Sequence, residues 1–460
     1  MNNFSSSTIF KKIFRRFLTF IEALKITKKT GIAILIIGLS LLSYLYIGSS
    51  ISSIAYRPVA KLDLNQTYLR ESKLYLNETF GPRLEDSCRR WGVVATTNNP
   101  TDAILRVIGI PSWCLVIVPD LNTPVDFMEQ LEDLLQRNYS NFKRDENRIT
   151  LTHNNNTIVY LSVDKQKEFE RVEGAVGDFV KATQWNHFSR KNIGYLFAIF
   201  NGAQFIFDFT DDVFIKLDDK TGKPMDILPE GNELNEMILK NVKVVIQGAT
   251  AFNHHPMMDA SLENSWARGF PMELIQNKST QGVTEYRIDY PLSGTLGTQR
   301  EIGVLQYFID ENPDIDAQLR SKKSLPTLTE SSPVLVPSHS YSPYNAKASI
   351  HSRDAMFAIL MPSTMSVCIS DIWRGYFAQC LFADAGLSLV FNPPKTARKH
   401  NESANHCDSQ EEALLYCKCM CCVLTSASIY NLHSRTYTSM PFYFSLSASI
   451  LTKCYILNIS

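Results

Sequence analysis

The chain has 460 residues, of which 45% are hydrophobic, so it is long enough for two or three domains with a sizeable core. Lysine plus arginine and aspartate plus glutamate both number 46, which makes the formal net charge zero. A nucleic-acid-binding protein normally carries a basic excess, so this balance argues against nucleic acid as a partner.

The N-terminus predicts a membrane anchor. No charged residue occurs between Lys29 and Arg57, and an apolar helix over residues 31–48 would be about 27 Å long, close to the core of a bilayer. Basic residues dominate before this run, so residues 1–30 are expected to be a cytosolic basic tail and residues 31–53 the transmembrane anchor of a single-pass type II protein. A cleaved signal peptide is the alternative, but the leader and the apolar run are both long for one.

Residues beyond the anchor are expected to be lumenal. Residues 54–87 lack a clear period and predict an extended stem. Four cysteines scattered through the following body are compatible with one or two disulfides in a secretory lumen: Cys88, Cys114, Cys368 and Cys380. Glycosylation triplets of the form Asn-x-Ser/Thr support the same topology, at Asn65, Asn77, Asn138, Asn155, Asn277 and Asn401.

The body alternates apolar runs with helical segments, which predicts an α/β fold with a mostly parallel sheet. Strands are expected at residues 91–98, 113–118, 157–161, 203–207 and 242–246. Several of these runs end in polar residues, as in a nucleotide-binding sheet, although loops often begin with Asn or Asp in any protein. The candidates for binding base and ribose at these ends are Thr96, Thr97, Asn98 and Asp120.

Residues 190–212 form the central unit of the body. A helix is expected to run from Arg190 to the Asn201-Gly202 turn, and the next strand then delivers Asp208, Asp211 and Asp212 to its carboxyl end. Clustered carboxylates there suit Mn²⁺ or Mg²⁺ holding a substrate diphosphate, and a solvated acidic loop is the alternative.

The start of the same helix offers basic and polar groups to a diphosphate. Arg190 and Lys191 would approach it with help from the positive end of the helix, and Asn192 follows them. Surface charge is the alternative interpretation. The dinucleotide, P-loop, serine-hydrolase and zincin motifs are all missing from the sequence, which argues against those enzyme classes.

Several separated blocks, in the same order, resemble the STELLO-like glycosyltransferase family, known from plant Golgi membranes and also found in animals. The blocks lie at residues 91–101, 113–118, 190–212, 266–271, 313–316, 343–345 and 370–376. The resemblance covers about residues 88–395 and implies a Golgi type II membrane protein. It implies a glycosyltransferase-A-like nucleotide-sugar domain over residues 88–325, followed by the C-terminal part of that catalytic-like domain over residues 326–395.

The resemblance also suggests further site residues. Trp266, Arg268 and Gly269 suit a sugar face and its hydroxyls, with a packed tryptophan as the alternative. Asp314 or Asp316 would serve as catalytic base, or as a helix cap. Two residues of the last block, Asp371 and Arg374, would face the acceptor or pair with each other.

Thr210 departs from the family pattern, which has an acidic residue in the middle of the aspartate cluster. The Asp-x-Asp spacing is interrupted here, although Asp208, Asp211 and Asp212 remain. Because Mg²⁺ usually takes only one or two protein carboxylates, this change weakens the prediction of activity without removing it.

Residues 396–460, which follow Pro393-Pro394, differ in composition from the body before them. They are rich in cysteine and serine and lack a sustained period, which predicts a poorly ordered tail or the product of an incorrect exon boundary.

Two functions follow from the sequence. The first is a Golgi glycosyltransferase that uses a nucleotide sugar and a divalent metal to modify a glycan or glycoconjugate acceptor. The second is a catalytically silent relative that organises other Golgi glycosyltransferases. A secretory-pathway hydrolase is a third alternative, for which no nucleophile and base can be named.

Overall fold

A computed structural model describes most of the predicted α/β body. It covers residues 76, 79–84, 88–139, 141–152, 155–228, 242–248, 253–259, 262–270, 283–289, 301–310, 314–315, 331–336 and 340–398. The predicted basic tail, anchor, most of the stem and nearly all of the C-terminal tail lie outside these residues. Within the described part, no helix is both long and apolar enough to cross a membrane.

The N-terminal half of the body is the predicted parallel sheet. Its strands are β1 (Arg90–Thr96), β2 (Trp113–Pro119), β5 (Thr157–Tyr160) and β6 (Phe205–Phe209), in the order β5-β2-β1-β6. All neighbours in this group are parallel, so their carboxyl ends meet at one edge. This half is a Rossmann-like arrangement and confirms the predicted α/β class. An antiparallel hairpin, β3 (Phe142–Asp145) and β4 (Arg148–Leu151), extends the β5 edge.

The other half of the same sheet is mixed rather than parallel. Beyond β6 the order is β12 (Ala348–Ser352), β10 (Glu301–Asp310), β13 (Leu387–Arg398), β11 (Val334–Val336), β8 (Val242–Gly248) and β9 (Val283–Asp289). Strand β12 is antiparallel to both β6 and β10, so it brings its first residue to the end where β6 finishes. The expectation of a mostly parallel sheet is therefore correct for only one half.

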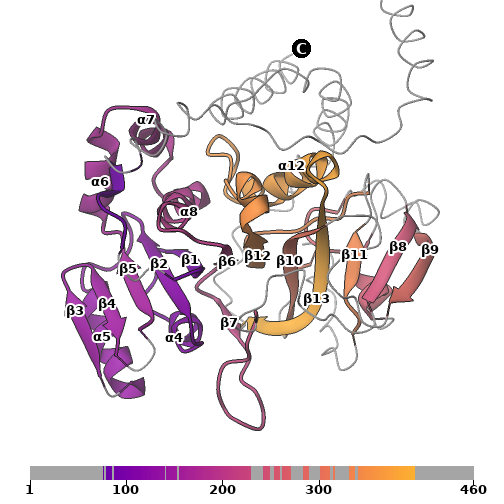
Figure 1. Ribbon diagram of the computed structural model, residues 1–460, viewed down its shortest axis with the longest axis horizontal. Coiled ribbons are helices and arrows are strands. Elements are labelled where there is room, and N and C mark those ends of the chain that lie inside the picture. Colours follow the sequence, from indigo (N-terminus) through magenta and orange to yellow (C-terminus); the bar gives the residue numbers. More distant parts are fainter. Residues whose placement is uncertain are drawn as a thin grey trace, which may run out of the picture. The chain divides into compact units, whose positions relative to one another are not determined.

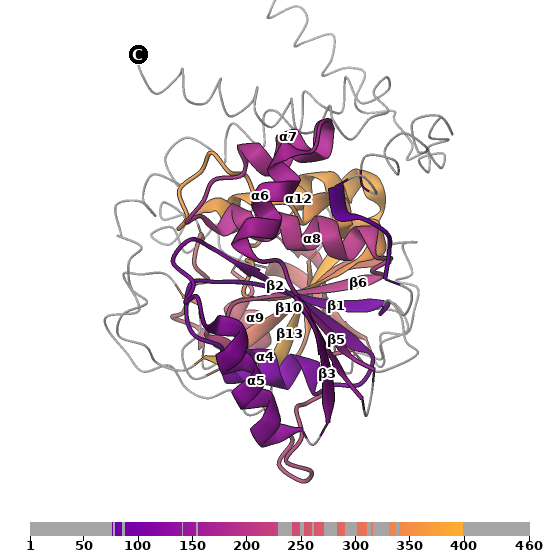
Figure 2. The same cartoon turned by 90° about the vertical axis from the view of Figure 1, so that its left-hand side faces the viewer.

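Helices cover both faces of the sheet (Figures 1 and 2). One face carries α4 (Asp102–Ile108) and α5 (Phe127–Asn138), and the other carries α6 (Val163–Arg171), α7 (Ala175–Ala182), α8 (Lys191–Phe200) and α12 (Ser370–Ala385). Shorter helical turns are α9 (His255–Met258), η2 (Phe188–Arg190) and η6 (Arg353–Ala358).

The central helix–turn–strand unit forms as predicted. Helix α8 ends at Phe200, and Gly202 takes the left-handed conformation with φ of 86° before β6 begins. Gly194 in α8 packs against β1 and β2 so closely that a Cβ atom there would lie 2.6 Å from Val93 Cγ1 and 2.8 Å from Val118 Cγ2. The missing side chain is what lets the helix lie on the sheet at this distance.

Side-chain alternation along β6 separates its residues between two cores. Phe205, Phe207 and Phe209 pack in the core on the α4 side, whereas Ile206 packs in the core beneath α8. Because successive side chains of a strand point to opposite faces, Asp208 lies on the same face as Ile206. It is completely buried there.

Strand β13 runs past the predicted boundary at residue 395. It passes through Pro393 and Pro394 at a register shift against β10, between the pairs Tyr307↔Asn392 and Ile309↔Thr396. Such irregularities are where a sheet tolerates proline. The strand then pairs with the short β7 (Val213–Ile215).

Candidate functional site

The carboxyl ends of β1 and β6 form a polar cluster around Asp211. Its Oδ2 atom accepts hydrogen bonds from Thr96 Oγ1 at 2.5 Å and from Asn98 Nδ2 at 2.9 Å. Thr101 Oγ1 donates to the Asp211 carbonyl oxygen at 2.8 Å. The structure therefore brings together three residues that the sequence proposed as ligands. It adds Thr101, the N-cap residue of α4.

Exposure within this cluster is graded. Asn98 and its neighbour Thr97 are exposed, Asp211 is half-buried, and Thr96 is buried. Burial raises the pKa of the Asp211 carboxyl, although Thr96 and Asn98 oppose the shift by donating to it. A half-buried carboxylate with a raised pKa at a sheet edge is a candidate functional acid.

Asp208 belongs to a different environment, beneath α8 and α12. Its Oδ1 atom accepts from Lys191 Nζ at 2.5 Å, and its Oδ2 atom accepts from Arg374 Nη1 at 2.7 Å. All three side chains are at most 1% exposed. Lys191 also donates to the backbone oxygens of Phe209 and Ala346. The predicted roles of Lys191 at a diphosphate and of Asp208 at a metal do not fit this buried ion pair.

The other two residues at the start of α8 are also bound inside the protein. Arg190 donates to Gln166, Glu170 and the carbonyl oxygen of Thr183, and its side chain is fully buried. Asn192 exchanges two hydrogen bonds with the backbone of Met361, each 2.8 Å long. These contacts correct the prediction that the start of the helix binds a diphosphate, because they hold α8 in place.

Asp120 has a similar structural use. Its carboxylate accepts from the backbone amides of Leu121 at 2.7 Å and Asn186 at 2.8 Å. It fixes the loop after β2 to the segment before η2, and its assignment to base or ribose stays a prediction.

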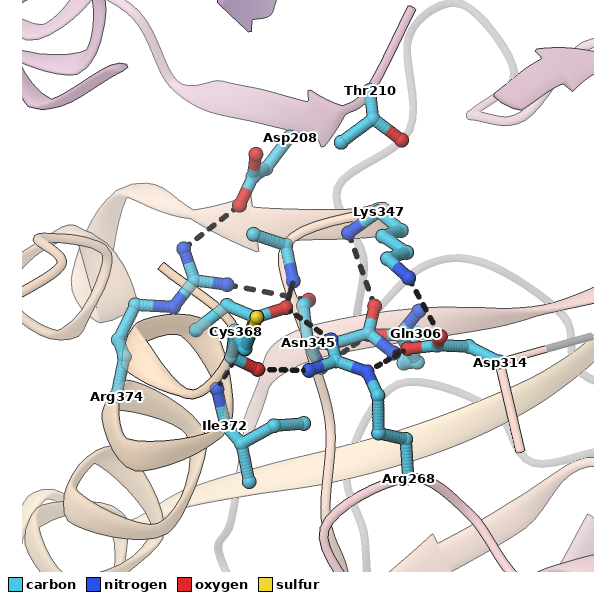
Figure 3. Close-up of polar contacts among 12 residues, drawn as sticks. Asp208, Thr210, Arg268, Gln306, Asp314, Asn345, Lys347, Cys368, Ile372 and Arg374 are labelled. Atoms are coloured by element: carbon cyan, nitrogen blue, oxygen red, sulfur yellow. Dashed lines mark hydrogen bonds and ion pairs between the residues drawn. The ribbon is translucent and has the colours of Figure 1, made fainter. Parts of the chain in front are cut away.

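Arg268 is the hub of a second buried network (Figure 3). Its Nε atom donates to Asp314 at 2.8 Å, its Nη2 atom to Asp371 at 2.6 Å, and its Nη1 atom to the carbonyl oxygen of Cys368 at 2.7 Å. Asp314 accepts in addition from Asn345 Nδ2 at 2.8 Å and Lys347 Nζ at 2.6 Å. Through these bonds, Asp314 and Asp371 hold together several segments of the second half of the body.

This network changes the assignment of the predicted catalytic and sugar-binding residues. Asp371 pairs with Arg268, and Arg374 pairs with Asp208, so the alternative pairing of Asp371 with Arg374 is also wrong. Asp314 is buried and held by several donors, which does not suit a general base. Asp316 lies outside the described residues.

Trp266 and Gly269, which flank Arg268 in the sequence, are packing residues. Trp266 is only 9% exposed, so its ring is not a sugar platform. Gly269 has φ of 90°, and a Cβ atom there would lie 2.4 Å from Ile372 Cγ2 of α12. The turn at residues 266–270 is therefore a structural contact with α12, and this corrects its predicted sugar-binding role.

Asp212 lies between two cations at the strand ends. Its Oδ2 atom accepts from Arg398 Nε at 2.6 Å, and its Oδ1 atom accepts from Thr210 Oγ1 at 2.6 Å. Although burial opposes ionisation, Arg398 and Lys347 hold the pKa of this carboxyl below its usual value. Sequence reasoning missed both cations. Lys347 follows the family block that ends at Asn345, which was its only signal, and Arg398 lay beyond the boundary drawn at residue 395.

The predicted three-carboxylate metal site does not fit this geometry. Asp208 is sequestered from Asp211 and Asp212, and both of its carboxylate oxygens are bound by cations. Among the described residues, no group of three or more His, Cys, Asp or Glu side chains is placed to hold a metal ion. Metal dependence stays a prediction, and among the described residues Asp211 and Asp212 are the remaining predicted carboxylates.

Known proteins similar to this chain are glycosyltransferases by name. No family model matches the sequence. Two curated relatives from Arabidopsis thaliana, "Probable glycosyltransferase STELLO2" and "Probable glycosyltransferase STELLO1", are each 24% identical to it over 316 residues. The match covers 67% of this chain and 35% of each relative, so the chain spans about a third of their length. The resemblance to STELLO-like glycosyltransferases is confirmed, and it supports a glycosyltransferase-like role.

Proposed function

We propose that this protein is a glycosyltransferase that binds a nucleotide sugar at the carboxyl ends of β1 and β6. The observation that carries the proposal is the cluster of Thr96, Asn98 and Asp211, which joins the two central parallel strands at the edge where α/β sheets bind ligands. The similarity to glycosyltransferases supports the class of ligand. Asp211, with its raised pKa and half-exposed position, is the residue we assign to the hydroxyls of the ribose or the donor sugar.

The reaction would transfer the sugar to a hydroxyl of a glycan or glycoconjugate acceptor. The acceptor oxygen forms a bond to the anomeric carbon, the bond from that carbon to the diphosphate oxygen breaks, and the acceptor proton passes to a base. Negative charge develops on the leaving diphosphate, so the site must supply positive charge there. Mn²⁺ or Mg²⁺ is the cofactor that the sequence predicts for this purpose, and among the described residues Asp211 and Asp212 are the candidate carboxylates for it.

We also propose that the protein is a single-pass type II Golgi membrane protein with a lumenal body. The disulfide between Cys88 and Cys114, which joins the beginnings of β1 and β2, supports an oxidising compartment. The predicted anchor and the Asn-x-Ser/Thr triplets support the same topology. Membrane lipid and other Golgi glycosyltransferases are the partners expected there.

A catalytically silent scaffold that organises other Golgi enzymes is the second candidate. It is favoured by Thr210 and by the internal use of Asp208, Asp314 and Arg374, which leaves few of the predicted catalytic groups available.

Binding and turnover measurements separate the two functions. The full chain is titrated calorimetrically with a panel of nucleotide sugars, with Mn²⁺ and with EDTA, and slow hydrolysis of the bound donor is followed. We expect one donor to bind and to be hydrolysed, and the Asp211→Ala/Asp212→Ala variant to lose at least about tenfold in affinity, since it loses polar contacts worth about 1.4 kcal/mol or more. Binding without turnover, with or without acceptor extracts, would favour the scaffold. If no nucleotide sugar binds, or the double variant binds equally well, the site assignment is wrong.

A further inference from the structure

Lys347 and Arg398 are two cations close to Asp212. Lys347 lies immediately before β12, and Arg398 lies at the end of β13. Lys347 immediately precedes β12, and the antiparallel register Ala348↔Phe209 places it next to Thr210 at the end of β6. Figure 3 shows Thr210 and Lys347 at these adjoining strand ends. Arg398 ends β13 and is the register partner of Val213, directly after Asp212. The ends of β6, β12 and β13 thus bring two positive charges to one place.

These two cations have more unused hydrogen-bond donors than Arg268 and Lys191. Arg268 donates through all three of its nitrogens, and Lys191 Nζ has three acceptors. In the part of the chain that the structure describes, Lys347 Nζ has one acceptor, Asp314. Arg398 there uses only its Nε atom, toward Asp212. Within these described residues, both Nη groups of Arg398 and two N–H groups of Lys347 are therefore available to a ligand.

The two side chains are more exposed than those of Arg190 and Arg374. Lys347 is 14% exposed and Arg398 is 9% exposed, compared with 0% for Arg190 and 1% for Arg374. Desolvated cations of this kind bind phosphate more strongly than fully solvated ones, and the planar guanidinium can bind two phosphate oxygens at once.

Thr210 is consistent with the same role. An acidic residue at this position would lie beside Lys347 and would add a third carboxylate to Asp211 and Asp212. Threonine adds no charge, and its hydroxyl donates to Asp212 instead. The replacement therefore lowers the negative potential where a diphosphate would bind and removes a carboxylate that a divalent metal would use.

We propose that Lys347 and Arg398 bind the diphosphate of the nucleotide ligand directly, and neutralise the charge that a divalent cation would otherwise neutralise. The inference rests on the proposed function, because it places the diphosphate at the same strand ends. It assigns the base-proximal and sugar-proximal contacts to Thr96, Asn98 and Asp211, and the phosphate contacts to the two cations.

Calorimetric titration of the full chain with nucleoside diphosphates and the matching monophosphates, in EDTA and in Mn²⁺, tests this assignment. We expect the preferred diphosphate to bind in EDTA within about threefold of its affinity in Mn²⁺. We expect Lys347→Gln and Arg398→Gln each to weaken diphosphate binding by about tenfold, because each loses a charge-assisted hydrogen bond. In the same variants, the affinity for the matching monophosphate should change by less than about threefold.

Three further variants distinguish ligand binding from a structural role. Lys347→Arg and Arg398→Lys keep the charge, so each should retain more diphosphate affinity than the corresponding glutamine variant. Lys216→Gln is the matched control, because Lys216 forms a 2.8 Å ion pair with Asp310 outside the cluster and should leave affinity unchanged. If the charge-conserving variants lose as much affinity as the glutamine variants while the control does not, the cations are structural and the inference is wrong.

The two proposals fail in different ways. If EDTA abolishes diphosphate binding, Mn²⁺ restores it and the glutamine variants bind normally, the direct phosphate contact is refuted and the nucleotide site stands. If no nucleotide binds the wild-type chain in either buffer, both proposals are refuted.

Discussion

At the level of single residues, three aspartates that are close in sequence have different environments in the fold. Asp208 faces the core beneath α8 and α12, whereas Asp211 and Asp212 follow the end of β6. Side-chain alternation along β6 turns Asp208 toward this core, and the strand ends at Phe209, before the other two aspartates. Asp208 therefore compensates two buried cations, and Asp211 is the carboxylate most suited to a ligand.

Replacing Asp208 tests its structural assignment. The Asp208→Asn variant would leave Lys191 and Arg374 buried with insufficient negative charge, and it should lower the free energy of unfolding by about 3–5 kcal/mol. Chemical denaturation measures this loss. The control is Glu132→Gln in the partly exposed pair with Arg144, which should cost at most about 1 kcal/mol. Equal, small losses in the two variants would contradict a compensating role for Asp208.

Replacing Asp211 should have the opposite effect on stability. Because burial raises its pKa in the folded state, the ionised carboxylate is disfavoured by the fold. The stability that protonation of Asp211 contributes is fully present below the pKa of this carboxyl in the unfolded chain, about 3.9. It is lost as the pH rises through the higher pKa of the folded state. Asp211→Asn should therefore be more stable than wild type at pH 7 in EDTA, and the gain should shrink as the pH approaches 4. Thermal unfolding across this range checks the prediction, and a gain that grows at low pH would contradict it.

At the level of elements, close packing fixes the helix that carries the buried cations. Gly194 lets α8 approach β1 and β2, and this contact places Lys191 over Asp208. The turn at Gly269 holds α12 in a similar way and places Arg374 on the other side of the same carboxylate. Both glycines therefore maintain the geometry of the ion pairs, because they set the positions of the two helices.

The Gly194→Ala variant tests this packing. Alanine is intrinsically favoured over glycine in a helix by about 1 kcal/mol, but overpacking a tight contact costs about 1–3 kcal/mol. We expect net destabilisation, because the new Cβ atom would lie 2.6 Å from Val93 Cγ1. Adding Val93→Ala should recover part of the loss in a double-mutant cycle of unfolding free energies. If the Gly194→Ala variant is instead more stable than wild type, the helix can move away from the sheet and the packing argument is wrong.

The elements that the sequence predicted well are those with strong apolar runs. β1, β2, β5, β6, β8 and α8 all occur close to their expected places. β3 was missed because its residues 142–145, Phe-Lys-Arg-Asp, are mostly charged. No strand was predicted at β13. Pro393-Pro394 predicts a break, and only the shifted register against β10 shows how the strand continues past it.

The functional residues were harder to predict because burial decides the role of a charge. Arg190 and Lys191 in a family block are buried with acids, whereas Lys347 and Arg398 keep donors unused among the described residues. No local pattern distinguishes these two situations. Thr96, Asn98 and Asp211 could be predicted since the ends of parallel strands meet at one edge by topology alone.

At the level of the whole body, one sheet combines a parallel half with a mixed half, and the candidate site lies where they join at β6 and β12. Residues from both halves contribute to it: Thr96 and Asp211 from one, and Lys347 and Arg398 from the other. The buried networks of Asp208 and Arg268 keep these strands in register. A ligand at this junction would therefore contact both halves of the sheet.

Hydrogen–deuterium exchange of the full chain, with and without a saturating nucleoside diphosphate, tests the location of the site most directly. The account predicts slower exchange in peptides that cover residues 94–101 and 207–213, since a bound ligand restricts opening of the backbone it contacts. Peptides of the β3–β4 hairpin serve as the internal control and should not change. Measurable binding that protects neither of the two segments would contradict a nucleotide site at the ends of β1 and β6.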